Sequence, residues 1–195
     1  MKLILASSSP RRAEILREAG IAFEIRAIEI DETVLPGETA LEMVARLAEA
    51  KARAIAAQMD VGMRDCIIVG ADTTVELDGA ILGKPRDSAH AREMLARLSG
   101  RTHHVQTGIF LLHLPGNAAR SAVENSAVTF APLSQKEIDG YVASGEPVGK
   151  AGAYAIQGIA GRFIPRVEGC YFNVVGLPLA RLYALLPELG WRNEE

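Results

Sequence analysis

Hydrophobic positions along this chain are spaced in two ways, which predict short buried strands and amphipathic helices. Leu3–Leu5 is a continuous apolar run, as in a strand that is buried on both faces of a sheet. Ser9 and Pro10 then follow as a natural N-cap and first helical residue, and Gly20 is expected to end that helix. The chain is therefore predicted to open with a strand, a serine-rich turn and a helix.

The strongest helix pattern runs from Thr39 to about Gln58. Thr39 and Glu42 have the spacing of a capping box. One face of this helix carries apolar residues at spacings of three and four, namely Leu41, Val44, Leu47 and Ile55. Lys51 falls on the same face. Such a lysine either buries its stem and keeps its charged head at the rim, or reaches a buried anion.

Other apolar or alternating segments predict further strands. Their ranges are Phe23–Ile30, Cys66–Gly70, Val75–Leu77, Ala80–Leu82, Thr102–Leu114 and Ser121–Phe130. Asp78-Gly79 is a two-residue turn signal that joins two of them as a hairpin. Helices are expected from Asp87 or Ser88 to about Leu98, from the capping box at Ser134 to near Gly145, and from Leu177-Pro178 onward.

Glycines punctuate the chain between those last two helices. Short strands are expected there around Ala153–Ile156, Phe163–Val167 and Cys170–Val175, and a polar, frayed tail is expected from Gly190. Strands alternate with helices early in the chain, whereas hairpins appear later. This order favours an α/β fold in which a mixed sheet carries helices on its faces.

Composition and charge narrow the class of protein. Of the 195 residues, 49% are hydrophobic and 23% are charged, as in an ordinary globular chain. The formal net charge of −3 argues against a nucleic-acid coat or a membrane-surface binder, so an anion site would need a local cluster of basic residues. Cys66 and Cys170 lie in apolar segments and are expected to be buried thiols. Since no signal-peptide pattern or membrane-length apolar run occurs, we expect a cytoplasmic protein.

Ser7–Arg12 combines the features of a phosphate-binding turn. Backbone N–H groups at a helix start, three serine hydroxyls and two arginines would meet there. An ordinary capped helix with two solvated arginines is the alternative. Gly79–Lys84 is one residue short of a P-loop and is followed by Pro85, and no dinucleotide-binding glycine motif follows a strand.

Polar groups also follow predicted strands at Asp31-Glu32, Asp72-Thr73 and Gly83-Lys84. Because sites in α/β folds collect at the carboxyl ends of strands, we expect these segments to meet the serine turn. Two carboxylates facing several cations would bind a hard divalent metal, Mg²⁺ or Mn²⁺, shared with phosphate oxygens. Asp72 could simply form a turn, but its place after a fully apolar run favours a paired or ligating carboxylate.

The histidines and serines give little support to other chemistries. His103 and His104 point to opposite faces of a strand, so they cannot easily share a metal, and one of them is expected to pack against or orient a neighbour. The chain lacks a Gly-x-Ser-x-Gly motif, so the sequence does not favour a serine hydrolase.

Taken in order, these motifs resemble the Maf family of nucleoside triphosphate pyrophosphatases. The resemblance extends to about Leu186 and is carried by Ser7–Arg12, Asp31-Glu32, Ala50–Ala52, Gly70–Thr73, Gly83–Arg86, Ser99–Gly108, Ala151–Gly158 and Gly169–Pro178. It implies hydrolysis of a nucleoside triphosphate to the monophosphate and pyrophosphate with a divalent metal. It also implies a fold like that of inosine triphosphate pyrophosphatases, with a curved mixed sheet and two lobes around a cleft. A single domain over residues 1–195 and a homodimer are expected on the same ground.

The resemblance also implies roles for individual residues. Asp72 matches the catalytic aspartate that accepts a proton from water, and it shares the metal with Glu32. Arg12, Lys51 and Lys84 match the phosphate-binding cations, and Ser7 and Ser9 of the serine turn are expected to bind phosphate with them. Arg11, Thr73 and Gln157 match the specificity positions of the branch that prefers dTTP and UTP. A glutamine amide suits that preference, since it can accept from the imide N–H of uracil or thymine and donate to a carbonyl.

Two other functions stay open from the sequence. One is the branch of the same family that acts on 7-methyl-GTP, and the other is a non-catalytic nucleotide-binding regulator of septum formation. The pairing of Glu32 with Asp72 favours an enzyme, because a pure polyphosphate binder gains little from added negative charge without a metal. Modified pyrimidine triphosphates are further candidate substrates.

Overall fold

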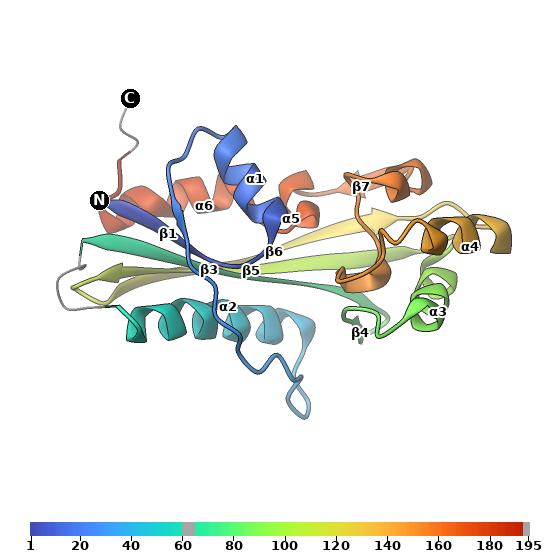
Figure 1. The fold of residues 1–195 in the computed structure, drawn as a ribbon, viewed down its shortest axis with the longest axis horizontal. Helices are drawn as coiled ribbons and strands as arrows, with labels where there is room; N and C mark the ends of the chain where they lie inside the picture. Colours follow the sequence, from blue (N-terminus) through green and yellow to red (C-terminus); the bar gives the residue numbers. More distant parts are fainter. Residues whose placement is uncertain (60–64, 193–195) are drawn as a thin grey trace.

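The computed structural model describes residues 1–59 and 65–192, and a mixed sheet runs along its length (Figure 1). Its strands are β1 (Lys2–Ala6), β2 (Glu24–Ile25), β3 (Cys66–Leu77), β4 (Ala80–Leu82), β5 (Thr102–Leu114), β6 (Ala118–Thr129) and β7 (Arg166–Glu168). The order across the sheet is β2-β1-β3-β5-β6-β7, and β4 pairs with the end of β3. β1 is parallel to β2 and β3, whereas the other pairs are antiparallel. The predicted α/β class with a mixed sheet is therefore confirmed.

Helices cover both faces of this sheet. They are α1 (Pro10–Glu18), α2 (Ala40–Ala57), α3 (Ser88–Leu98), α4 (Gln135–Ala143), α5 (Tyr171–Val175), α6 (Leu179–Leu185) and the short 3-10 helices η1 (Ala151–Ala153), η2 (Ile159–Phe163) and η3 (Leu186–Leu189). Figure 1 shows α2 along one face and α1, α5 and α6 along the other, with α3 and α4 beyond them near β4. None of the helices in the described ranges is long and apolar enough to cross a membrane.

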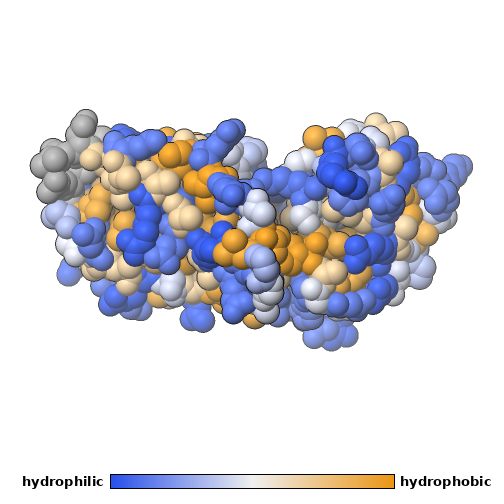
Figure 2. Space-filling view, turned by 90° about the horizontal axis from the view of Figure 1, so that it is seen from below, coloured by the Kyte–Doolittle hydropathy of each residue, from blue (hydrophilic) through white to orange (hydrophobic). Residues whose placement is uncertain are grey.

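The hydrophobic core follows the same division. Successive side chains of a strand point to opposite faces, so Ile4 of β1 packs with Ile55 of α2, while Leu5 packs with Ile15 of α1. A third core lies around α3 and α4 and includes Leu95. The molecule therefore has two bulkier ends on one sheet, and the space-filling view shows the surface hollowed between them (Figure 2).

α2 contacts the sheet through two glycines. A Cβ added to Gly70 of β3 would lie 2.0 Å from the carbonyl oxygen of Ala48, and one added to Gly108 of β5 would lie 2.3 Å from that of Val44. The missing side chains thus allow backbone to approach backbone. The buried face of α2 passes through Ala40 rather than Leu41, which is 46% exposed, so the expected apolar face is wrong at that position.

Local signals predicted most element boundaries correctly. Both capping boxes are formed, at Thr39 and at Ser134, and Asp87 caps α3 by accepting from the backbone N–H of His90. The hairpin at Asp78-Gly79 joins β3 to β4, and β5 and β6 are the predicted antiparallel pair. These features depend on residues that are neighbours in sequence, which explains why they could be found there.

Four of the predicted strands are wrong or too long, and one of them, Phe163–Val167, has only its last two residues in a strand, β7. Only Glu24–Ile25 of the segment Phe23–Ile30 is a strand, because its partner β1 ends at Ala6. Ala153–Ile156 is not a strand, and Cys170–Val175 forms α5 instead. Periodicity alone cannot separate a short buried helix from a strand.

Two expectations about burial are also corrected. Cys66 is buried, but Cys170 is half-buried, and neither forms a disulfide. Burial raises the pKa of the Cys66 thiol, and the neighbouring Asp65 raises it further. Trp191 is buried at 6% exposure, so the tail is packed at that residue, while residues 193–195 lie outside the described ranges.

Candidate functional site

The main cleft opens at a break in the strand pairing of β3. One edge of β3 pairs with β5 from Cys66 to Glu76. The other edge pairs with β1 as far as Gly70 and with β4 only from Val75 onward. Within the described part of the chain, residues 71–74 therefore have a strand on one side only, and a cavity of about 960 Å³ lies against them. The predicted strands Cys66–Gly70 and Val75–Leu77 are thus parts of one continuous strand, and Asp72 lies inside it rather than forming a turn, which was the alternative for this residue.

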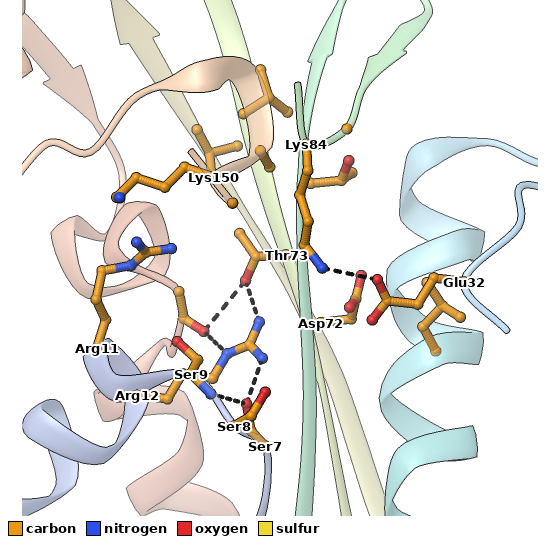
Figure 3. Close-up of a pocket in the computed structure, with 18 of the residues that line it drawn as sticks. Ser7, Ser8, Ser9, Arg11, Arg12, Glu32, Asp72, Thr73, Lys84 and Lys150 are labelled. Carbon is orange, nitrogen blue, oxygen red and sulfur yellow. Dashed lines mark hydrogen bonds and ion pairs between the residues drawn. The ribbon is translucent and has the colours of Figure 1, made fainter. Parts of the chain in front are cut away.

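All ten residues singled out from the sequence line this one cleft. They are Ser7, Ser9, Arg11, Arg12, Glu32, Lys51, Asp72, Thr73, Lys84 and Gln157. Figure 3 shows eight of them, which come from the serine turn and the start of α1, the segment before α2, β3 and the segment after β4. Lys51 comes from α2, and Gln157 comes from the loop after η1. The structure therefore brings together side chains that are far apart in the sequence, whereas their roles stay predictions.

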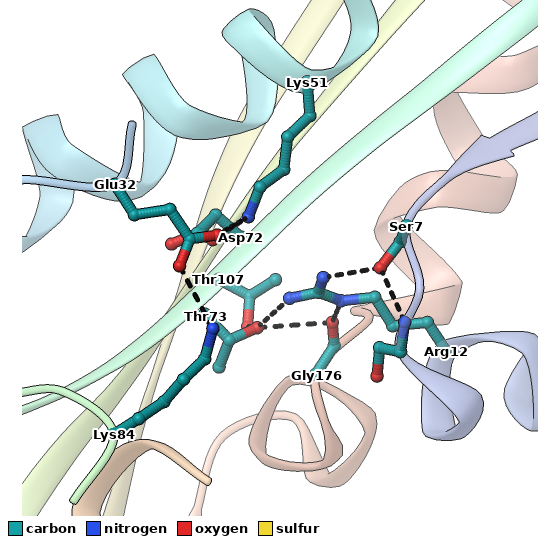
Figure 4. Close-up of polar contacts among 10 residues, drawn as sticks. Ser7, Arg12, Glu32, Lys51, Asp72, Thr73, Lys84, Thr107 and Gly176 are labelled. Atoms are coloured by element: carbon teal, nitrogen blue, oxygen red, sulfur yellow. Dashed lines mark hydrogen bonds and ion pairs between the residues drawn. The ribbon is translucent and has the colours of Figure 1, made fainter. Parts of the chain in front are cut away.

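Two carboxylates share the ammonium group of Lys51 (Figure 4). Its Nζ lies 2.5 Å from Oδ1 of Asp72 and 2.7 Å from Oε1 of Glu32. Lys84 donates to the other oxygen of Glu32 at 3.1 Å. Of the two possibilities for Lys51, the second is confirmed, because its charged head reaches the buried carboxylate of Asp72 and only 11% of its side chain is exposed. Among the described residues, Oδ2 of Asp72 has no hydrogen-bond partner.

The surrounding cations determine the charge state of Glu32. Burial alone would raise the pKa of this carboxyl group. The hydrogen bonds and positive charges of Lys51 and Lys84 outweigh burial, so the pKa of Glu32 lies below its usual value. Glu32 is therefore ionised at neutral pH, as a metal ligand or cation partner needs to be.

Arg12 ties the serine turn to the sheet and to α5 (Figure 4). Its Nε donates to the carbonyl oxygen of Gly176 at 2.8 Å, and its two Nη atoms donate to the hydroxyls of Ser7 at 2.9 Å and Thr73 at 3.0 Å. The side chain is buried, which lowers the pKa of Arg12, while the charge of Asp72 acts in the opposite direction. The protein thus uses three of the five guanidinium N–H groups, and a ligand can reach only the others.

The serine turn leaves donors at the start of α1. Ser7 accepts from the backbone N–H of Ser9 at 3.2 Å as well as from Arg12. Ser9 occupies the N-cap position as predicted, but its side chain makes no capping hydrogen bond. The Ser9 hydroxyl and the first N–H groups of the helix therefore have no partner within the helix. Helix starts with such donors commonly bind anions.

A second wall of the cleft carries Gln157 on a loop after η1. Glu146 holds this loop, since its carboxylate accepts from the backbone N–H of Ile159 at 2.9 Å and of Ala160 at 3.3 Å. The Tyr141 hydroxyl also donates to this carboxylate at 2.8 Å. Burial would raise the pKa of Glu146, but these hydrogen bonds lower it below its usual value. Gln157 therefore lies on a fixed loop at the cleft edge.

Sequence reasoning missed Lys150, which lines the same cleft. Figure 3 shows its charged end near that of Arg11, across the cleft from Glu32. A signal was present in the sequence, because Gly149-Lys150 repeats the glycine-lysine pair Gly83-Lys84. The pair lies in a glycine-rich segment whose course could not be predicted.

His103 has the packing role that was expected for one of the adjacent histidines. It is fully buried beneath Phe130 and Tyr154, and its Nε2 lies 2.8 Å from the Tyr154 hydroxyl. Burial lowers the pKa of His103 to about 4, so the ring is neutral at pH 7. It lies in the core around α3 and α4 and does not line the cleft.

The cleft fits a divalent metal only if a ligand completes the coordination. Because Glu32 and Asp72 bind the same ammonium group, their nearest oxygens lie at most about 5 Å apart. In residues 1–59 and 65–192, no three His, Cys, Asp or Glu side chains form a metal cluster. Two carboxylates that share an ion with phosphate oxygens and water match the way in which Mg²⁺ is commonly bound.

Comparisons with known proteins agree with this geometry. The profile of the Maf family, described as Maf-like protein, matches residues 2–189. A dTTP/UTP pyrophosphatase of Anaeromyxobacter sp. (strain Fw109-5) is 50% identical and covers 97% of this chain and 90% of its own length. A dTTP/UTP pyrophosphatase of Acinetobacter baylyi is 50% identical, covering 93% of this chain and 96% of its own length.

A solved structure supports the fold. The Staphylococcus aureus Ham1 protein superposes with a TM-score of 0.53 at 14% identity, covering 96% of this chain and 99% of its own. This likeness concerns the fold alone and confirms the predicted mixed sheet with helices. The sequence profile and the relatives at about half identity decide the family. This chain belongs to the family of Maf-like proteins.

Proposed function

We propose that this protein hydrolyses dTTP and UTP to the nucleoside monophosphate and pyrophosphate. The observation that carries the proposal is the cluster of Glu32 and Asp72 around Lys51 in a cleft that is also lined by the serine turn. Curated relatives of nearly the same length are named for this reaction. A cytoplasmic, single-domain homodimer is part of the same proposal, and light scattering of the purified protein tests the dimer.

The charges of the cleft suit a triphosphate. Its lining has five basic side chains, Arg11, Arg12, Lys51, Lys84 and Lys150, and three acidic ones, Glu29, Glu32 and Asp72. This local excess of positive charge occurs in a chain whose formal net charge is −3. Lys84, Ser9 and the start of α1 supply donors for the polyphosphate, and they stabilise charge as it moves onto the departing pyrophosphate.

Asp72 is suited to take the proton from the attacking water. Lys51 occupies Oδ1, so Oδ2 is left to accept the proton. The side chain is 10% exposed, and a charge in such a site interacts strongly with its neighbours. Water attacks the α-phosphorus as its proton passes to Asp72, and the bond to the bridging oxygen breaks to release pyrophosphate.

Glu32 and Asp72 are the residues that would hold Mg²⁺ or Mn²⁺, because both contact Lys51 and therefore lie close together. When bound, such an ion supplies positive charge that polarises the phosphate oxygens. Lys51 keeps the two carboxylates close together, and Lys84 orients Glu32 from its other side.

The nucleobase specificity is assigned to Gln157, with Arg11 and Thr73. A glutamine amide can pair with the imide N–H and a carbonyl of uracil or thymine. The hydroxyl of Thr73 is engaged by Arg12 at 3.0 Å and by Thr107 at 2.9 Å. Thr73 therefore contributes to specificity by placing its neighbours rather than by a hydroxyl contact with the base.

Pyrophosphate release from a panel of triphosphates tests the proposal. The wild-type protein is expected to prefer dTTP and UTP over CTP, ATP, GTP and 7-methyl-GTP. Asp72→Asn should lower kcat by about 10²–10⁴-fold, the range of general base catalysis. Asp139→Asn is the matched control, because Asp139 pairs with Arg92 on the surface at 2.7 Å. The proposal fails if the wild type releases no pyrophosphate, prefers 7-methyl-GTP, or loses no activity in folded Asp72→Asn.

A further inference from the structure

Two cations on one wall of the cleft lack an anionic partner. Arg11 makes no hydrogen bond and no ion pair with any residue in the described ranges. Lys150 donates only to backbone carbonyl oxygens, of Glu146 at 2.6 Å and of Val148 at 3.4 Å. Figure 3 shows the two charged ends close to each other, on the side of the cleft away from Glu32.

The position of Lys150 is fixed by its backbone. Gly149 has a φ of +71°, which turns the chain just before Lys150. Two residues after Lys150, the N–H of Gly152 donates to the carbonyl oxygen of Gly83 at 3.1 Å. The loop that carries Lys150 is therefore tied to the segment that carries Lys84, and the ammonium group is held over the cleft with one N–H uncommitted.

In residues 1–59 and 65–192, no carboxylate forms an ion pair with Arg11 or Lys150, and Glu146 is the one acidic group that acts on Lys150 from a distance. The carboxylate of Glu146 already accepts from Tyr141 and from two backbone N–H groups. Burial lowers the pKa of Lys150, the charge of Arg11 lowers it further, and Glu146 opposes both effects. Burial likewise lowers the pKa of Arg11. Two half-buried like charges repel each other, and an anion between them would relieve that repulsion.

We propose that Arg11 and Lys150 form a second anion subsite, which binds phosphate oxygens of the substrate on the wall across from Glu32 and Asp72. This inference rests on the proposed function and adds Lys150 to it as a phosphate contact that the sequence did not suggest. Arg11 then affects nucleotide preference by placing the phosphates relative to Gln157, and not by touching the base. A neutral base carbonyl would satisfy hydrogen bonds but not the net positive charge. A phosphate satisfies both, and charge-assisted bonds to it are the stronger.

Binding of inorganic tripolyphosphate, measured by calorimetry at two salt concentrations, tests the subsite without a nucleobase. Lys150→Gln should raise the Kd about 10-fold and reduce its salt dependence, and the KM for UTP should rise by a similar factor. Lys150→Arg should retain most of the affinity. Lys136→Gln is the control, because Lys136 is exposed on α4 and does not line the cleft.

Further measurements distinguish a contact with the phosphates from a contact with the base, and a second variant covers the case in which the first does not fold. If Lys150→Gln weakens uridine binding but leaves tripolyphosphate binding unchanged, Lys150 contacts the base and the proposal is wrong. If Lys150→Gln does not fold, Arg11→Gln must show the same loss of tripolyphosphate affinity, and unchanged affinity there overturns the subsite. If the wild type binds tripolyphosphate more tightly than Lys150→Gln but releases no pyrophosphate, the proposed function is wrong and the subsite is supported.

Discussion

Replacing Gly70 by alanine tests whether the distance between α2 and the sheet sets the geometry of the carboxylate cluster. The new Cβ would lie 2.0 Å from the carbonyl oxygen of Ala48 and 3.0 Å from the backbone nitrogen of Ala52. Both atoms belong to the backbone of a packed helix, so neither can rotate away. To restore ordinary contact at 3.4 Å, α2 must move by about 1.4 Å relative to β3.

This shift would act directly on the bond between Lys51 and Asp72. Lys51 lies between Ala48 and Ala52 on the same helix, and its Nζ is now 2.5 Å from Oδ1 of Asp72. A displacement of that size would take Nζ of Lys51 out of hydrogen-bonding distance of Asp72, unless the lysine side chain changes rotamer. Misplacing a catalytic group by about 1 Å can cost roughly 10²-fold in rate, so we expect kcat for UTP to fall by about that factor.

Stability should fall as well. Overpacking a core costs about 1–3 kcal/mol, which corresponds to a Tm lower by roughly 2–12 °C in a chain of this size. Differential scanning fluorimetry and a pyrophosphate-release assay measure the two effects. Gly140→Ala is the matched control, because Gly140 lies in α4 with no atom within 4 Å of an added Cβ. It should gain about 0.5–1 kcal/mol and keep wild-type kcat.

The result that refutes this reasoning is specific. Gly70→Ala with wild-type Tm and kcat would mean that α2 does not lie as close to β3 as described. A lower Tm with unchanged kcat would keep the steric contact but show that the helix position does not control Lys51.

Three further predictions concern the nucleobase, the metal and the buried His103. Gln157→Ala should reduce the ratio of kcat/KM for UTP to that for GTP by about 10-fold, while inhibition by pyrophosphate stays within twofold; an unchanged ratio rules out base reading. Excess EDTA should abolish pyrophosphate release and Mg²⁺ should restore it, whereas full activity in EDTA contradicts the metal at Glu32 and Asp72. Because burial lowers the pKa of His103 to about 4, from an unfolded value near 6.5, the unfolded chain binds the extra proton between these values. The free energy of unfolding should therefore drop by about 2–3 kcal/mol from pH 7 to pH 4, and a urea titration series in which His103→Gln shows the same drop would refute that assignment.

The sequence alone determined the elements whose causes are local. Capping boxes at Thr39 and Ser134 set where two helices begin, and Asp78-Gly79 set a hairpin. The same sequence, through resemblance, pointed to the side chains that line the cleft. Such features are visible because a cap, a turn or a motif needs only residues within a few positions of one another.

The tertiary structure decided which groups face one another. Leu41 and Lys51 share a predicted apolar face, yet Lys51 is buried because it pairs with Asp72 and Glu32, whereas Leu41 is exposed because the packed face of α2 passes beside it. Lys150 had no assigned role until its loop was tied to Gly83 across the cleft. Burial and charge pairing depend on contacts between distant segments, and no periodicity within one segment records them.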